Sequence, residues 1–265
     1  MTESTNVLAV AWERWVQRWD AQQTTYIEDR ERRFDVMLSW VETLVGEEIV
    51  VLDLAAGPGA VSDRVLRRFP RARSVAVDTD PVLLAVGEGA FGDRDGRLRW
   101  VRADLREADW VAAVGRQPFD AVLSTTALHW LSPAQLADVY RRAHGLLRPG
   151  GVLVNGDYLP FPRSLRRLQA AAKELDGRRQ AVAVARGADA WQDWWDGLRA
   201  EPSLQEAFAE RERVFPPGER TWTTPGLAFH EAALVEAGFA EVGVVWQDLE
   251  ERVLIGLTTE PEGPT

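Results

Sequence analysis

A glycine-rich turn at residues 55–59 joins an apolar run to an amphipathic stretch. The run over 49–54 is apolar except for Asp53, and Gly57 and Gly59 lie in the turn that follows it. Glycine lets a backbone pass close to a ligand, because no Cβ stands in the way. The turn after the first strand of a parallel sheet is a usual docking place for a nucleotide-like group. The segment therefore predicts a binding site for such a group.

Acidic residues follow the next two predicted strands. Asp78 follows a strand over 74–77, where a carboxylate accepts hydrogen bonds from the hydroxyls of a ribose. Asp104 follows a strand over 98–101. Because parallel strands end at one edge of a sheet, we expect both carboxylates near the turn that follows Asp53.

Two of the three histidines of the chain are candidates for acid–base chemistry. His129 stands one short turn after a predicted strand over 121–124, and His230 lies in a predicted helix near 229–237. Histidine is the side chain whose charge changes near neutral pH. His129 is therefore a candidate base or orienting group, with packing on the next helix as the alternative. His230 is a second candidate, with capping or packing as the alternative.

Strands and helices alternate after residue 46 and position these residues. The predicted strands cover 49–54, 74–77, 98–101, 121–124, 152–155, 240–247 and 251–257. Strands separated by helices predict a parallel sheet with right-handed crossovers, and continuous apolar strands predict helices on both faces. We predict an α/β fold with a Rossmann-like, seven-stranded, mostly parallel sheet.

Four segments are expected along the chain. They are an N-terminal helical cap (1–46), a cofactor-binding α/β core (47–157), a helical lid inserted after the fifth strand (158–226), and a helix with the last two strands of the core (227–258). The cap carries Trp12, Trp15 and Trp19 on one helix face, and the lid carries Trp191, Trp194 and Trp195. Either these rings line an acceptor site, or they pack the cap on the lid.

Composition excludes several classes of function. The 265 residues include no cysteine, which removes disulfides, thiolate metal sites and cysteine nucleophiles, and we expect no metal site. Lys173 is the only lysine, so that a lysine base is nearly excluded. The net charge of −10 disfavours nucleic-acid and anionic-membrane partners. With no apolar run of transmembrane length and no signal-like start, we expect a cytoplasmic protein.

Five motifs in order resemble the class I S-adenosylmethionine-dependent methyltransferases. They are Asp53 with AAGPG, VAVDTD around Asp78, VRADL around Asp104, FDAVLSTTALHWL and LLRPGGVLV. The resemblance runs from about residue 20 to 257. Within the family, the chain looks most similar to enzymes that act on small molecules, such as trans-aconitate and malonyl-thioester carboxyl methyltransferases. Ala55 departs from the pattern, which often has glycine there. The resemblance implies S-adenosylmethionine as cofactor and methyl transfer to O, N or C of a small organic acceptor, with secondary metabolism as one setting.

The resemblance also implies roles for individual residues. Asp78 would hold the ribose hydroxyls, and Asp104 the adenine amino group with the Leu105 backbone beside it. Gly57 and Gly59 would line the methionine end, where Asp53 acts at the amino group directly or through water. The remaining residues of the implied cofactor site are Ala55, Thr79, Ser124 and Thr125, the last two beneath the methyl donor.

Tyr26 and Arg33 have two interpretations. In similar enzymes a tyrosine followed seven positions later by an arginine closes over the cofactor, and the arginine pairs with the methionine carboxylate. The alternative is an ordinary helix surface with pairs such as Glu28 and Arg32.

Two other classes of protein stay open. A nucleotide-dependent oxidoreductase would want the fingerprint G-x-G-x-x-G, but Ser62 stands at the third glycine position, and a pyrophosphate disfavours nearby acids. S-adenosylmethionine has no phosphate and carries a sulfonium cation, which suits an acid-rich rim. The other class is a non-catalytic protein that binds S-adenosylmethionine.

The lid offers candidates for acceptor binding. Arg163, Arg166 and Arg167 at its start are suited to a carboxylate substrate, with a solvated helix face as the alternative. A carboxylate acceptor needs no base, whereas an acceptor atom that carries a proton of high pKa does. The sequence predicts neither the acceptor nor an oligomeric state.

Overall fold

The computed structural model describes residues 2–185, 191–216 and 225–260. Its sheet has the strand order β3-β2-β1-β4-β5-β7-β6. The strands are β1 (Val50–Leu54), β2 (Arg73–Asp78), β3 (Leu98–Arg102), β4 (Phe119–Thr125), β5 (Leu147–Tyr158), β6 (Glu241–Asp248) and β7 (Glu251–Leu257). The helices are α1 (Thr2–Tyr26), α2 (Arg30–Val45), α3 (Ala60–Arg68), α4 (Pro81–Phe91), α5 (Trp110–Val114), α6 (Pro133–Leu146), α7 (Arg166–Ala185), α8 (Trp191–Arg199), α9 (Gln205–Val214) and α10 (Leu227–Glu236).

The sheet is mostly parallel, as predicted. β1 pairs in parallel with β2 on one side and with β4 on the other. Among the described strands, β7 runs antiparallel to its neighbours β5 and β6, and the other pairings are parallel. The chain leaves β1 toward β2 and later returns to β4, so the switch point of the topology, where ligands bind in such sheets, lies beyond the carboxyl ends of β1 and β4.

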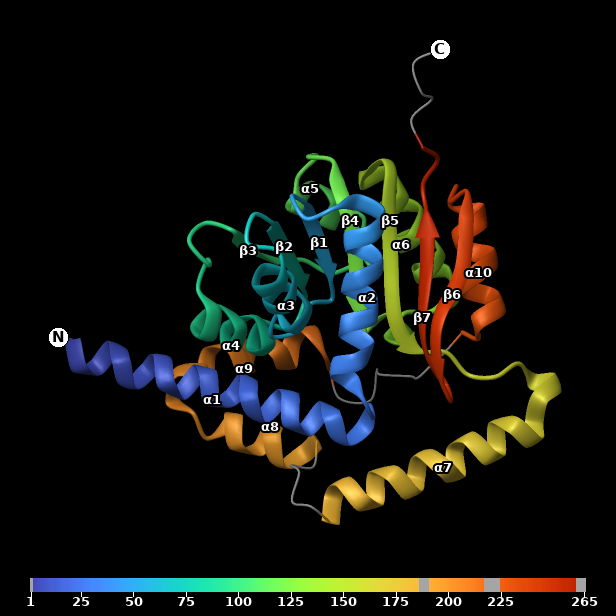
Figure 1. The fold of residues 1–265 in the computed structure, drawn as a ribbon. Coiled ribbons are helices and arrows are strands. Elements are labelled where there is room, and N and C mark those ends of the chain that lie inside the picture. Colours follow the sequence, from blue (N-terminus) through green and yellow to red (C-terminus); the bar gives the residue numbers. More distant parts are fainter. Residues whose placement is uncertain (1, 186–190, 217–224, 261–265) are drawn as a thin grey trace.

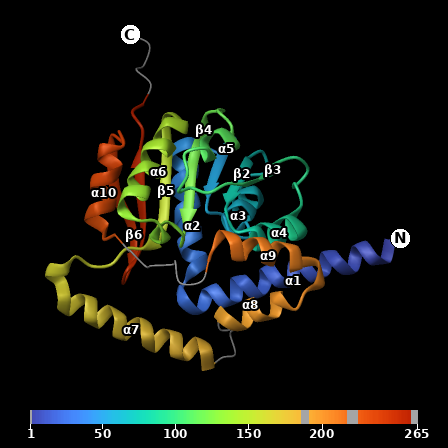
Figure 2. The same cartoon turned by 180° about the vertical axis from the view of Figure 1, so that it is seen from behind.

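Helices cover both faces of the sheet, as predicted (Figures 1 and 2). On one face α2 and α3 bury Met37, Val41 and Val65 against the sheet. On the other face α5, α6 and α10 bury residues such as Trp110 and Leu234. Burial of this apolar surface is the dominant stabilising contribution to the fold.

Local sequence signals set the helix boundaries. Pro81 opens α4, and the Asp80 side chain accepts hydrogen bonds from the first free backbone N–H groups of that helix. α6 begins with a capping box between Ser132 and Gln135. α2 ends at Gly46, whose φ of 87° favours glycine.

The long N-terminal helix α1 lies beneath the carboxyl ends of the parallel strands, together with α8 and α9 (Figure 1). Trp194 lies between Trp15 and Trp19, with ring centroids 6.3 and 4.8 Å away. Trp191 contacts Trp19 at 5.6 Å, and Trp195 contacts Trp194 at 5.0 Å. The tryptophans therefore pack the two helical segments together, which is the second of the two interpretations of the sequence.

The structure differs from the predicted elements in a few places. The fifth strand extends beyond 152–155 to Leu147–Tyr158, and the short helix α5 has no counterpart in the prediction. The insertion at 158–226 holds the helices α7, α8 and α9, and its stretches 186–190 and 217–224 lie outside the described residues. In the part of the chain that the structure describes, no helix combines the length and apolar character needed to cross a membrane.

Candidate cofactor and acceptor site

The turn after β1 is tight and lies in the left-handed backbone region. Ala55, Gly57 and Gly59 have φ values of 52°, 57° and 83°. The turn is held by a hydrogen bond from the Ala56 N–H to the Val77 carbonyl (3.0 Å) and by one from the Gly59 N–H to the Ala56 carbonyl (2.9 Å). The strained residue is Ala55, because the left-handed region costs an alanine about 1 kcal/mol that a glycine does not lose.

The two glycines have different surroundings. A Cβ placed on Gly57 would meet nothing nearer than Leu83 Cδ1 at 3.9 Å. A Cβ on Gly59 would lie 2.5 Å from the Trp100 ring. Gly57 therefore leaves open space beside the turn. At Gly59, the Trp100 ring occupies the place where a side chain would lie.

The carboxylate of Asp78 is fixed beneath the turn. Its Oδ2 accepts the Gly57 N–H at 2.8 Å, and its Oδ1 accepts the Asp80 N–H at 2.8 Å. Burial raises the pKa of Asp78 to about 6, although the backbone N–H groups, including that of Thr79, act in the opposite direction. Each oxygen keeps a further lone pair, so the group can accept two hydroxyl hydrogen bonds.

Asp53 is buried at the end of β1 and has one unused oxygen. Its Oδ2 accepts from the backbone N–H of Ser62 at 3.0 Å and from the Ser62 hydroxyl at 2.7 Å, near the start of α3. Its Oδ1 is buried and has no hydrogen-bond partner among the residues that the structure describes. Burial raises the pKa of Asp53 to about 7, against the two bonds from Ser62. An orphaned buried oxygen of this kind fits a cationic partner such as an amino group.

Asp104 lies after β3 and is paired with Arg106. The Arg106 backbone N–H and Nε each donate to Asp104 Oδ1 at 2.9 Å. Burial raises the pKa of Asp104, but the hydrogen bonds and charge of Arg106 outweigh it, so the pKa lies below its ordinary value. The neighbouring Leu105 side chain is buried in the core. An adenine amino group at Asp104 would share the carboxylate with Arg106.

Arg33 of α2 reaches the carboxyl end of β4. Its Nη2 donates to Thr125 Oγ1 at 2.7 Å and to Thr126 Oγ1 at 2.6 Å, and its Nη1 forms an ion pair with Glu251. Ser124, one position earlier, instead donates to the Leu54 carbonyl at 2.9 Å. The guanidinium is thus fully buried at the site edge, and the sequence did not point to its partner Glu251.

Tyr26 lies at the end of α1 and is half-exposed. Its hydroxyl accepts a hydrogen bond from the Trp191 backbone N–H at 3.3 Å. It also lines a small hollow with Tyr158 and Glu251, and Glu251 is the residue that pairs with Arg33. The two residues of the predicted closing pair thus reach the same part of the carboxyl edge by different contacts.

His129 and Asp157 form a buried pair that the sequence did not predict. His129 Nδ1 lies 2.7 Å from Asp157 Oδ1, and the His129 backbone N–H donates to Asp157 Oδ2 at 3.1 Å. Burial lowers the pKa of His129, but the charge and hydrogen bond of Asp157 outweigh it, and the pKa is raised above its ordinary value. Asp157 is the penultimate residue of β5, in the sequence NGDY, and an acid near the end of a parallel strand is the signal that would have found it.

His230 belongs to the packing between α6 and α10. Its Nδ1 lies 2.7 Å from the Tyr140 hydroxyl, and both side chains are fully buried. Burial lowers the pKa of His230 to about 4, so the imidazole is neutral at physiological pH. These contacts agree with the packing alternative for this residue.

The lid touches the same edge through Arg211 of α9. Its Nε donates to Asp80 Oδ2 at 2.7 Å, and the guanidinium lies over the Trp195 ring, 3.9 Å from its centroid. The Asp80 backbone N–H in turn holds Asp78. The helical insertion is therefore linked to the residue predicted to hold the ribose.

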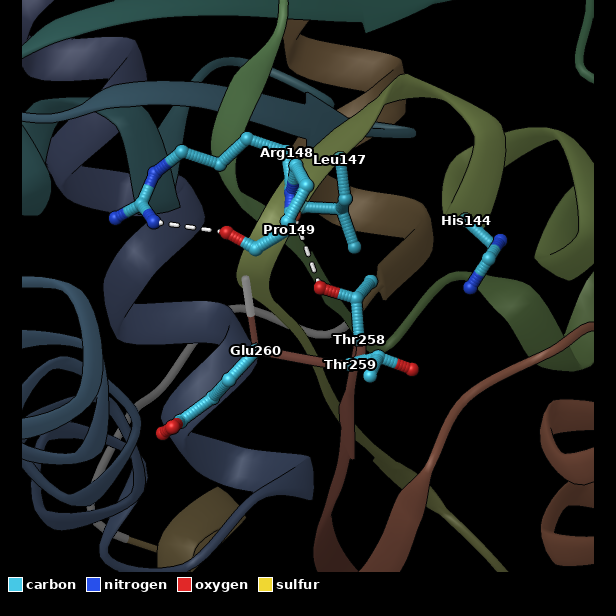
Figure 3. A pocket seen from close by; sticks show the side chains of 7 residues that line it. All are labelled: His144, Leu147, Arg148, Pro149, Thr258, Thr259 and Glu260. Atoms are coloured by element: carbon cyan, nitrogen blue, oxygen red, sulfur yellow. Dashed lines mark hydrogen bonds between the residues drawn. The ribbon is translucent and has the colours of Figure 1, made fainter. Parts of the chain in front are cut away.

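A pocket of about 320 Å³ lies at the opposite end of the sheet (Figure 3). It is lined by His144, Leu147, Arg148, Pro149, Thr258, Thr259 and Glu260. These residues stand at the amino end of β5 and after β7, away from the carboxyl ends of β1 and β4. None of the predicted site residues lines it.

Comparison with known proteins identifies the relatives of the chain. Residues 51–151 match the family described as a methyltransferase domain. The trans-aconitate 2-methyltransferase of Streptomyces avermitilis is 32% identical over 168 residues, which are 61% of this chain and 60% of the relative. The chain thus covers less than two thirds of that protein's length.

Solved structures share the fold. A sugar N-methyltransferase from Streptoalloteichus sp. superimposes with a TM-score of 0.54 at 16% identity, covering 88% of this chain and 89% of that one. An O-methyltransferase family protein from Burkholderia thailandensis gives 0.54 at 21% identity, covering 91% and 64%. The family match and the trans-aconitate 2-methyltransferase relative confirm the resemblance to S-adenosylmethionine-dependent methyltransferases that the motifs predicted, and the solved structures show the shared fold.

Proposed function

We propose that this chain is a class I S-adenosylmethionine-dependent methyltransferase that acts on a small organic acceptor. The observation that carries the proposal is the pairing of Asp78 with the open Gly57 turn at the switch point of the sheet. The unused, buried Oδ1 of Asp53 supports it, because the amino group of the cofactor would supply the missing partner.

Each residue of the site has a proposed part in binding the cofactor. Asp78 holds the ribose hydroxyls, and Asp53 holds the amino group. Arg33, between Thr125 and Glu251, binds the methionine carboxylate. Asp104 meets the adenine amino group. The helices α1, α8 and α9 cover the edge and exclude water.

Methyl transfer requires mainly that the protein align the acceptor atom with the methyl group. When bound, S-adenosylmethionine supplies a methyl group on a sulfonium that is already a good leaving group. The protein holds the acceptor atom in line with the methyl and keeps water out. Where that atom carries a proton, His129 accepts it at Nε2, because Asp157 holds the Nδ1 proton and thereby sets the tautomer.

Titration calorimetry with S-adenosylhomocysteine tests the proposal. We expect saturable binding by the full chain and none of NADH. The test variant is Asp78→Asn, which removes the charge of the carboxylate proposed to hold the ribose. The control variant is Glu107→Gln, which removes an exposed charge in the loop after β3. A fall in affinity of about tenfold or more in the first variant alone supports the assignment. No binding of S-adenosylhomocysteine by the parent protein, or tight binding of NADH, refutes the function.

A further inference from the structure

Arg252 of β7 is a buried arginine, and two of its three guanidinium nitrogens have no hydrogen-bond partner among the described residues. The residue is 3% exposed, and these two nitrogens, Nε and Nη1, are buried. A buried guanidinium normally has carboxylate or carbonyl partners, because removing the charge from water is costly. Burial lowers the pKa of Arg252, against nearby carboxylates that raise it. The side chain can therefore accept a partner that the described part of the chain does not supply.

Two of the nearby carboxylates are engaged elsewhere. Glu250 accepts hydrogen bonds from Tyr158 and Gln169, and Glu251 pairs with Arg33. The third, Glu231 of α10, acts on Arg252 only through its charge, and within the described ranges it forms no ion pair with Arg252.

The position of Arg252 separates it from the proposed cofactor site. Consecutive residues of a strand point to opposite faces of the sheet. Glu251 meets Arg33 of α2 on one face, and Arg252 therefore points to the other face, where α10 lies. Across the ladder Arg252 is the register partner of Asp157, which holds His129. Arg252 thus stands one strand away from the proposed proton acceptor.

An aromatic ring lies against the guanidinium. Arg252 Cζ lies over the Phe161 ring, 4.8 Å from its centroid. A ring at this position covers one side of the guanidinium and does not use its N–H donors. A carboxylate or phosphate is the group that best fits these donors.

We propose that Arg252 binds an oxyanion of the methyl acceptor, such as a carboxylate or a phosphate, on the α10 side of the sheet. This inference rests on the proposed function. The oxyanion anchors the acceptor while a different atom of it, next to His129, receives the methyl group. The acceptor class is then a hydroxy or amino compound that carries an acidic group, rather than an acceptor methylated on the acid itself.

The first test uses the ligand-free protein and needs no acceptor. In Arg252→Met the cost of an unpartnered buried charge disappears, so we expect an unchanged or higher melting temperature. The matched control is Arg64→Met, which removes a buried arginine paired with Asp20 and Glu31; its melting temperature falls by about 5 °C or more. A comparable fall in Arg252→Met would show that Arg252 has only a structural role and would overturn the proposal.

The second test compares acceptors in pairs. A panel of hydroxy and amino carboxylic acids is assayed for S-adenosylhomocysteine release, each acid beside its primary amide, and phosphate esters form a second arm. We expect kcat/KM to favour the charged member of the best pair by about tenfold or more, and Arg252→Met to abolish this preference. Arg178→Met, which changes an exposed arginine of α7 paired with Glu174, retains it. Equal turnover of acids and amides, or a preference that survives Arg252→Met, contradicts the proposal.

A third measurement decides the question if no panel member reacts. Sodium benzoate, benzamide and inorganic phosphate are added separately to the protein saturated with S-adenosylhomocysteine. Benzoate or phosphate is expected to raise the melting temperature of the parent but not that of Arg252→Met. An equal effect on both proteins, or none on the parent, overturns the proposal. Failure to bind S-adenosylhomocysteine is a separate result, which refutes the proposed function instead.

Discussion

His129 Nδ1 lies 2.7 Å from Asp157 Oδ1, although 28 residues separate the two in the chain. The pairing sets the tautomer of the imidazole and raises the pKa of His129 above its ordinary value of 6.5. Because only the neutral imidazole accepts a proton, we expect kcat/KM for a hydroxyl or amine acceptor to rise with pH, with a midpoint above 6.5.

The variant Asp157→Asn removes the charge that raises this pKa. The midpoint of the pH profile should move to lower pH, and kcat should fall by about a hundredfold because the imidazole loses its orientation. Asp138→Asn, which alters a surface acid paired with Arg141 and Arg142, is the control. An unchanged midpoint in Asp157→Asn would assign the pair to packing.

The titration of Asp78 predicts how cofactor affinity depends on pH. Burial raises the pKa of Asp78 to about 6. Below that pH the protonated group accepts hydroxyl hydrogen bonds poorly, so the dissociation constant of S-adenosylhomocysteine should increase as pH falls through about 6. Calorimetry across this range checks it. In Asp78→Asn the component centred near 6 should vanish, and its persistence would mean that another group is responsible.

The substitutions Gly57→Ala and Gly59→Ala are expected to differ in their main effect. Gly59→Ala places a Cβ 2.5 Å from Trp100, so we expect a loss of stability of about 2 kcal/mol or more. Gly57→Ala meets no atom nearer than 3.9 Å, and only the strain of its φ of 57° remains, which costs about 1 kcal/mol. Its main effect should be weaker cofactor binding, since the Cβ enters the open side of the turn. Denaturant unfolding and calorimetry on both variants separate the two effects.

The substitution Ala55→Gly is expected to stabilise the protein. The φ of 52° at this position strains an alanine, so Ala55→Gly should raise the free energy of unfolding by about 0.5–1 kcal/mol. Ala56→Gly is the matched control: Ala56 is buried and has no positive φ, and the variant should be destabilised by about 1 kcal/mol. Urea unfolding measures both, and a destabilised Ala55→Gly would contradict the strain argument.

The sequence by itself determined the strands and helices, and the edge of the sheet at which the candidate site residues lie. Apolar runs and their helical spacers predicted the seven strands and their mostly parallel arrangement, because periodicity and turn residues are local properties. They placed Asp53, Gly57 and Asp78 together for the same reason: strand ends in a parallel sheet share an edge.

Only the tertiary structure decided which side chains meet across that edge. Asp157 reaches His129 because β4 and β5 are neighbours, and Glu251 reaches Arg33 because β7 inserts antiparallel beside β5. The different surroundings of Gly57 and Gly59 depend on where the Trp100 ring packs. Arg252 Nε and Nη1 have no partner in the described residues, because Glu250 and Glu251 already bind other side chains. Such contacts join residues distant in the chain, and local sequence patterns carry no information about side-chain packing between them.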